Sequence, residues 1–258
     1  MALIQQELKK CYIWSTAVKK VYLGGVQVRP KEYPYLCFTA NTAGSTVALN
    51  KQGSPTVVTL ETSTDGSNWS TYTIWNTITL SNIWDKVYWR NTSETTTGFS
   101  TAANARYYFS MTWSIAASGD ITSLINKNCT DTLSWNYCFN NLFESCTSLT
   151  TPPKLIATTL TQYCYYYMFM NCTDLEVLPK LPAITLAKYC YNSMFYMCSK
   201  IKLSTTQTWV YQTLYRIPTT WTWTTATNAL QNMFASTTWT FTWTPSINTT
   251  YYTSNTLV

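Results

Sequence analysis

The sequence predicts a two-part α+β protein, in which an all-β sandwich precedes a short solenoid of stacked repeats. Short runs rich in β-branched and aromatic residues, separated by turn signals, fill the first half of the chain. Cysteines recur at a spacing of 26 residues in the second half. Of the 258 residues 46% are hydrophobic and only 11% are charged, so the chain has enough apolar material for a packed core.

Residues 1–32 are expected to form a tether that attaches the protein to a larger assembly. Residues 12–23 predict two short strands around a turn, Gly24 and Gly25 close them, and residues 26–28 alternate as a strand does. The N-terminus has no apolar stretch of signal-peptide length. No stretch approaches the roughly 20 apolar residues that span a membrane, so we expect no membrane span.

Residues 33–117 predict an immunoglobulin-like β-sandwich, because several short strands follow one another at close spacing. Residues 64–68 form a strong turn signal, with Asp65 followed by Gly66. The expected strands are 35–40, 46–50, 56–62, 70–74, 77–80, 86–90 and 106–113.

Residues 118–258 carry the repeat. Residues 160–169 place apolar side chains at i, i+3 and i+4, which predicts a helix, and residues 175–182 predict a short strand limited by its prolines. One helix and one strand per repeat predict a leucine-rich-repeat solenoid, with a degenerate copy at 228–234 as its cap. The expected repeat core is Cys138, Cys164 and Cys190; Cys146, Cys172 and Cys198; Phe143, Phe169 and Phe195; and Leu149, Leu160, Leu175 and Leu186.

The two cysteine columns are interpreted as ladders of small buried thiols, because free cysteine is among the most often buried residue types. The chain has nine cysteines, no histidine and no Cys-x-x-Cys sequence. A tetrahedral zinc site would therefore need an all-cysteine set at unfamiliar spacing. We expect no metal and no cofactor.

The repeat resembles the BspA-like leucine-rich repeats of gut bacteria and their phages. The residues that carry the likeness are Cys-Thr-Ser-Leu at 146–149, Ala-Thr-Thr-Leu at 157–160, Tyr-Cys-Tyr at 163–165 and Met-Phe at 168–169. Residues 18–30 are similar to an opening common in phage structural proteins. The resemblance implies surface display and adhesion, and it implies no catalytic residues.

The composition argues against two other classes of function. Without histidine the commonest general base is missing, and the 11 acidic residues form no catalytic motif. The net charge of +6 is small, and no run of lysine or arginine exceeds two residues, so a nucleic-acid partner is not expected.

The predicted function is therefore a non-enzymatic phage virion protein that displays its repeats to a host surface. Two alternatives stay open: a bacterial cell-surface adhesin in an extracellular setting, and a carbohydrate-binding module. The expected partners are other virion or surface-assembly proteins at the N-terminal part and a host protein or glycan at the repeats. Exposed strand edges would also allow a homo-oligomer.

Eleven of the twelve tryptophans, all except Trp69, stand where this kind of sequence would place glycine. Average composition predicts roughly 18 glycines in a chain of this length. The chain has 7, and the eleven tryptophans equal the shortfall. One hypothesis is a reassigned UGA codon, one base from a glycine codon. The alternative is that the tryptophans are genuine and form a platform for sugar rings.

Overall fold

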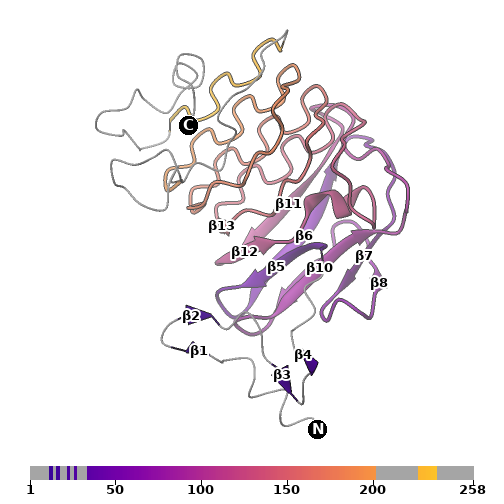
Figure 1. Cartoon of the computed structure of the whole chain (residues 1–258), viewed down its shortest axis with the longest axis vertical. Coiled ribbons are helices and arrows are strands. Elements are labelled where there is room, and N and C mark those ends of the chain that lie inside the picture. The colour runs from indigo at the N-terminus through magenta and orange to yellow at the C-terminus, as the bar shows by residue number, and fades with distance from the viewer. Residues whose placement is uncertain are drawn as a thin grey trace. The chain divides into compact units, whose positions relative to one another are not determined.

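The computed structural model describes residues 34–201 and 226–236, together with four short strands near the N-terminus (Figure 1). The chain divides into two compact units, Met1–Tyr33 and Pro34–Val258. In the first unit the strands pair as two antiparallel hairpins, in the segment where short strands were expected. The hairpins are β1 (Tyr12–Ile13) with β2 (Thr16–Ala17), and β3 (Tyr22–Leu23) with β4 (Val26–Gln27).

The larger unit begins with two sheets. Its strands are β5 (Leu36–Ala40), β6 (Ser45–Gln52), β7 (Leu60–Ser63), β8 (Ser70–Thr71), β9 (Thr77–Leu80), β10 (Lys86–Asn91), β11 (Arg106–Thr112), β12 (Ile115–Ser118) and β13 (Leu149–Thr151). One sheet has the order β13-β12-β5-β10-β7-β8 and the other the order β11-β6-β9. Each of the seven expected strand segments overlaps one of these strands, whereas β12 and β13 were not anticipated.

Alternating burial along the strands builds the core between the sheets. In β10, Val87 and Trp89 point inward, and in β11, Tyr107 and Phe109 do so. The Trp89 ring lies 5.3 Å from the ring of Phe109, centroid to centroid, and meets it edge-on. Such edge-to-face packing of large rings contributes beyond the area that it buries.

The strand order differs from that of an immunoglobulin domain. In the immunoglobulin fold the first strand lies beside the second, and the seventh joins the opposite sheet. Here β5, the first strand, lies between β10 and β12, while β11, the seventh, pairs with β6. The first and seventh strands have exchanged sheets, so the expected immunoglobulin-like order is wrong.

The expected α+β class and its leucine-rich-repeat solenoid are also wrong. The described residues contain no α-helix, only the 3-10 helix η2 (Ile121–Leu124), which Asp120 caps through its side chain. Residues 160–169 form successive turns, and residues 175–182 form no named strand. The described part of the chain is therefore an all-β fold built on two sheets, followed by turns.

The apolar pattern misled because its period is four residues. In the first copy the buried residues are Cys138, Phe139, Leu142, Phe143 and Cys146, which correspond to i, i+1, i+4, i+5 and i+8. On a helix, position i+8 would lie about 80° around the axis from position i, still on one broad stripe. Over so few residues, a period of four and the helical period of 3.6 residues give nearly the same pattern of buried positions.

Backbone conformation excludes a helix in these segments. Every fourth residue has a positive φ, which interrupts right-handed helical hydrogen bonding. The residues are Tyr137, Asn141 and Ser145; Tyr163, Tyr167 and Asn171; Tyr189, Ser193 and Met197; and Asn228, Asn232 and Ser236. We call the four segments 137–146, 163–172, 189–198 and 228–236 the turn stack.

Hydrogen bonds hold the turns of the stack to one another. Alternate N–H groups close their own turn, as Asn140 does to the Tyr137 carbonyl at 3.0 Å. The remaining N–H groups donate to carbonyl oxygens of the next copy, as the Phe139 amide does to the Cys164 carbonyl at 2.9 Å. Five such bonds join each neighbouring pair of described turns. This pairing satisfies buried backbone groups without a helix or a sheet.

Candidate functional site

The expected repeat-core residues lie in the interior of the turn stack and are not available to a ligand. Both cysteine columns, the three phenylalanines, Leu149, Leu175 and Leu186 are buried, and Leu160 is partly buried. A binding or catalytic site must therefore be made by other residues of these turns.

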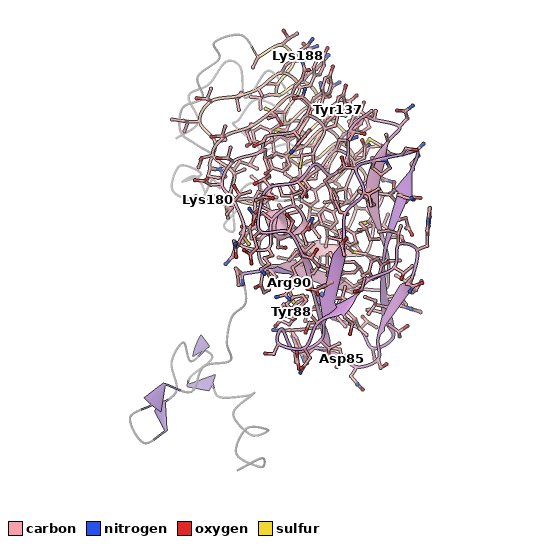
Figure 2. The ribbon with its side chains drawn as sticks, turned by 90° about the vertical axis from the view of Figure 1, so that its right-hand side faces the viewer. Asp85, Tyr88, Arg90, Tyr137, Lys180 and Lys188 are labelled. Atoms are coloured by element: carbon pink, nitrogen blue, oxygen red, sulfur yellow. The ribbon has the colours of Figure 1, made fainter. Side chains whose placement is uncertain are left out.

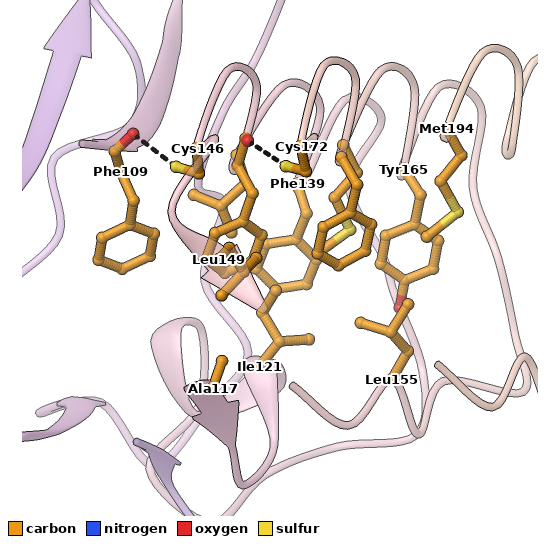
Figure 3. Close-up of a cluster of buried hydrophobic side chains, with 14 of the residues drawn as sticks. Phe109, Ala117, Ile121, Phe139, Cys146, Leu149, Leu155, Tyr165, Cys172 and Met194 are labelled. Carbon is orange, nitrogen blue, oxygen red and sulfur yellow. Dashed lines mark hydrogen bonds between the residues drawn. The ribbon is translucent and has the colours of Figure 1, made fainter. Parts of the chain in front are cut away.

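The second cysteine column ties each turn to the structure that precedes it. The Sγ atoms of Cys146, Cys172 and Cys198 donate to the carbonyl oxygens of Phe109, Phe143 and Phe169 at 3.2, 3.0 and 3.0 Å. Figure 3 shows the first two of these bonds, one reaching β11 and one reaching the turn before.

Burial makes these thiols poor nucleophiles and poor metal ligands. It raises the pKa of Cys190 and of Cys198 to about 12, and it raises the pKa of Cys164 and of Cys172 well above the ordinary value. A thiolate is the reactive and metal-binding form of cysteine. Among the residues that the structure describes, no group of three histidine, cysteine or acidic side chains is placed to hold a metal ion.

The phenylalanines form a continuous column that starts in the sandwich. The rings of Phe109, Phe143, Phe169, Phe195 and Phe234 follow one another with centroids 5.3, 5.3, 5.6 and 5.2 Å apart, and neighbouring planes are nearly parallel. Strand β11 thus provides the first ring of the column.

A second aromatic column lies on the outside of the stack. Tyr137, Tyr163 and Tyr189 occupy the same place in successive turns, with ring centroids 4.5 and 4.7 Å apart and planes within 6° of parallel. Tyr166 and Tyr167 lie beside this column, and Tyr166 meets the Tyr163 ring edge-on at 5.4 Å. These five half-buried tyrosines are called the tyrosine face.

The tyrosine face is polar at its rim but carries little charge. The Asn228 side-chain amide donates to the Tyr189 hydroxyl at 2.9 Å. The Lys188 ammonium lies 5.6 Å from the centroid of the Tyr189 ring, and Figure 2 shows Lys188 and Tyr137 at the same end of the large unit, far from Asp85. Burial raises the pKa of the Tyr137 and Tyr166 hydroxyls further above neutral pH, where a phenol is already protonated.

This arrangement can offer a ligand both apolar contact and hydrogen bonds. The ring faces within the column cover one another, so a ligand meets ring edges and hydroxyl groups. Each hydroxyl can donate one hydrogen bond and accept others. Such a surface suits a neutral partner that is rich in polar groups.

The sequence contained a signal for this face that the helical interpretation hid. A helix over residues 160–169 would place Tyr163 on the same core face as Leu160 and Cys164, yet its ring is half-buried on the outside of the stack. Tyrosine recurs at 137, 163 and 189, at the same spacing as the cysteines. Tyr165 and Tyr191 recur at the same spacing and are buried, so the repeat reveals aromatic columns but only the structure separates the outer column from the inner one.

A separate aromatic cluster on the sandwich is a closed structural contact. The Arg90 guanidinium carbon lies 3.9 Å from the centroid of the Trp69 ring and its nitrogen 2.8 Å from the Glu61 carboxylate. Trp69 also meets Tyr35 edge-on, with ring centroids 5.1 Å apart. Because the charge is paired and the ring is stacked, this cluster offers less to a ligand than the tyrosine face.

Comparisons of the chain with protein-family models, with curated proteins and with solved structures found no match. In the described part of the chain no helix has the length and apolar character needed to cross a membrane. The tyrosine face is therefore the candidate site on the strength of its own geometry.

Proposed function

We propose that this protein is a non-enzymatic surface-display and adhesion protein of a phage virion, of the fibre, decoration or receptor-binding type. The tyrosine face is the observation that carries the proposal. The likeness of the repeats to BspA-like sequences and of residues 18–30 to phage structural proteins supports the virion setting. A bacterial cell-surface adhesin is the alternative setting for the same face.

The rigidity of the turn stack favours binding by the tyrosine face. Five backbone hydrogen bonds hold each turn to the next, and the rings of Tyr137, Tyr163 and Tyr189 already support one another. A side chain that is ordered before binding loses little conformational entropy when the ligand arrives. Tyrosine combines large contact area with a polar tip, which explains its enrichment at binding surfaces.

The partner at this face would be a host surface protein or a glycan. A carbohydrate-binding module is the second candidate, because hydroxyl groups and amides such as that of Asn228 match the hydroxyls of a neutral sugar chain. The N-terminal unit would bind the rest of the virion or surface assembly. Pairing of exposed strand edges would make the protein oligomeric.

Binding is tested with two tyrosine variants. Tyr163→Ala removes the central ring of the face, whereas Tyr108→Ala removes a half-buried tyrosine of β11 in the sandwich. We expect Tyr163→Ala to weaken binding to host cells, or to a positive glycan on an array, by about tenfold or more. Tyr108→Ala should leave binding within about twofold of the parent chain. Equal binding by both variants would contradict the role of the face.

The setting is tested separately by locating the protein. Immunogold labelling and mass spectrometry of purified particles should find the chain in intact virions. Its recovery only from the cell envelope of a bacterium would replace the virion assignment with the adhesin. The binding experiment would remain valid in that case, because it depends on the tyrosine face alone.

A further inference from the structure

Tryptophan occupies backbone positions in the sandwich that are otherwise taken only by glycine. Within residues 34–120 every residue with a positive φ is a glycine or a tryptophan. The glycines are Gly44, Gly53, Gly66 and Gly119, with φ of 80°, 62°, 71° and 69°. The tryptophans are Trp75, Trp84 and Trp113, with φ of 78°, 73° and 60°.

Two of these tryptophans and one of the glycines hold the same place in equivalent turns. Gly44, Trp75 and Trp84 are each the third residue of a four-residue turn closed by a backbone hydrogen bond. The closing bonds join the amides of Ser45, Asn76 and Asp85 to the carbonyls of Thr42, Thr73 and Asn82 at 3.4, 3.1 and 3.2 Å. A type II turn requires positive φ at this third position, which is why glycine prevails there.

The side chains of these tryptophans make few contacts that could offset the energetic cost of a positive φ. The residues Trp75, Trp84 and Trp113 are 55%, 71% and 67% exposed. The turn stack also has non-glycine residues at positive φ, but there the backbone bonds the next turn and tyrosine rings stack on one another. Trp75 meets the Tyr108 ring edge-on with centroids 6.4 Å apart, whereas no ring contact with a described residue compensates Trp84 or Trp113.

Two other tryptophans have the opposite character. Trp89 is fully buried, and its ring lies 4.5 Å from that of Tyr72, centroid to centroid. Trp69 stacks on the Arg90 guanidinium. Neither has a positive φ, and nor does Trp135, the remaining described tryptophan, which is 50% exposed. This corrects the interpretation of eleven glycine-like tryptophans, since Trp89 joins Trp69 as a residue that the fold needs. Trp14, Trp209, Trp221, Trp223, Trp239 and Trp243 lie outside the described residues.

We propose that the natural polypeptide carries glycine at positions 75, 84 and 113 and tryptophan at positions 69 and 89. The cause would be a reassigned UGA codon, which differs by one base from the glycine codon GGA, whereas UGG specifies tryptophan. The source must then supply a glycine-charged tRNA that pairs with UGA. The natural sandwich surface would lack these three indoles, so they would form no platform for sugar rings.

The gene and the natural protein test the proposal directly. We expect UGA codons at 75, 84 and 113 and UGG codons at 69 and 89. Peptide mass spectrometry of protein purified from its native source should find glycine at the first three positions and tryptophan at the other two. Tryptophan at all five positions overturns the proposal, and so does glycine at position 69 or 89.

Recombinant variants test the backbone argument independently. Trp84→Gly and Trp113→Gly should each raise the midpoint of thermal unfolding by about 2–4 °C, because they relieve the cost of a side chain at positive φ. Trp84→Ala and Trp113→Ala are the matched controls, since they remove the indole but keep a Cβ at the strained position. Trp89→Gly should lower the midpoint by removing a buried ring. Glycine variants no more stable than the alanine variants would contradict the argument.

Discussion

A cysteine thiol in the turn stack supplies the second hydrogen bond to a buried carbonyl. The Phe143 carbonyl accepts from the Cys146 amide at 3.0 Å, which closes its own turn, and from the Cys172 thiol at 3.0 Å, which joins it to the next. The Phe169 carbonyl does the same with Cys172 and Cys198. A thiol fits here because it packs as a small apolar group and still donates weakly.

Because burial raises the pKa of these thiols, stability should depend on pH above about 9. The pKa of Cys190 and of Cys198 rises from an ordinary 9.0 to about 12 on folding. Folded thiols therefore keep protons that unfolded thiols lose, and their stabilising effect is complete below pH 9 and is lost between pH 9 and 12. Each such thiol should lower the free energy of unfolding by about 1.4 kcal/mol per pH unit in that window.

The measurement is urea unfolding at pH 7, 9 and 10 with a reducing agent present. The contribution of the thiols to the free energy of unfolding should be nearly constant up to pH 9. Above pH 9 the free energy of unfolding should fall steeply. An unchanged value at pH 10 would show that the thiols are exposed in solution. Alkylation with iodoacetamide at pH 8 gives a second readout, because Cys164 and Cys172 should react only after unfolding.

At the scale of the element, each turn of the stack presents donors to the next copy and acceptors to the previous one. The Tyr137 amide meets the Gln162 carbonyl, and the Tyr163 amide meets the Lys188 carbonyl. The register therefore depends on the number of residues between equivalent positions, and a whole copy is the unit that can be removed or added.

Deletion of residues 162–187, which is one copy of 26 residues, should leave a folded protein. Tyr137 would then donate to the Lys188 carbonyl, and Phe143 would stack on Phe195. The matched control deletes one residue more, 162–188, which shifts every donor by one position and turns buried side chains outward. Circular dichroism and protease resistance should show native-like folding for the first variant and not for the second. Equal behaviour of the two would contradict a register set by these bonds.

For the large unit as a whole, the sandwich and the turn stack share one hydrophobic core. The cluster of buried residues runs from Leu36 on β5 to Phe234 in the last described turn without a break. Strand β11 acts as the first layer of the stack, because the Phe109 amide donates to the Leu142 carbonyl at 2.8 Å and its carbonyl accepts from the Cys146 thiol. The sandwich thus covers the end of the stack that would otherwise expose unpaired groups.

Phe109→Ala should therefore destabilise both parts together. Loss of a buried phenylalanine side chain costs about 3–5 kcal/mol, and here the ring contacts Phe38 in the sandwich and Phe143 in the stack. Calorimetry should show one transition that moves to lower temperature. Phe234→Ala, at the far end of the column, is the control and should affect the sandwich less. Two separate transitions, with only one of them shifted, would contradict a shared core.

Local sequence patterns determined most of the strands and the existence of the repeat. Alternation and turn residues place β5, β6, β9, β10 and β11 where they lie, because a half-buried strand leaves a period of two in the sequence. The spacing of the cysteines revealed the copies. The wrong helix at 160–169 came from an apolar pattern that fits two periods, although its four tyrosines, Thr161 and Cys164 are poor helix formers.

The tertiary structure decided which sheet each strand joins, and it decided that the repeats form turns. The exchange of β5 and β11 between the sheets depends on contacts between residues far apart in the chain, which no local pattern records. Every fourth residue of a turn takes a positive φ because an amide in that turn can bond to the neighbouring copy. The tyrosine face exists for the same reason, since its rings meet only when consecutive copies are stacked.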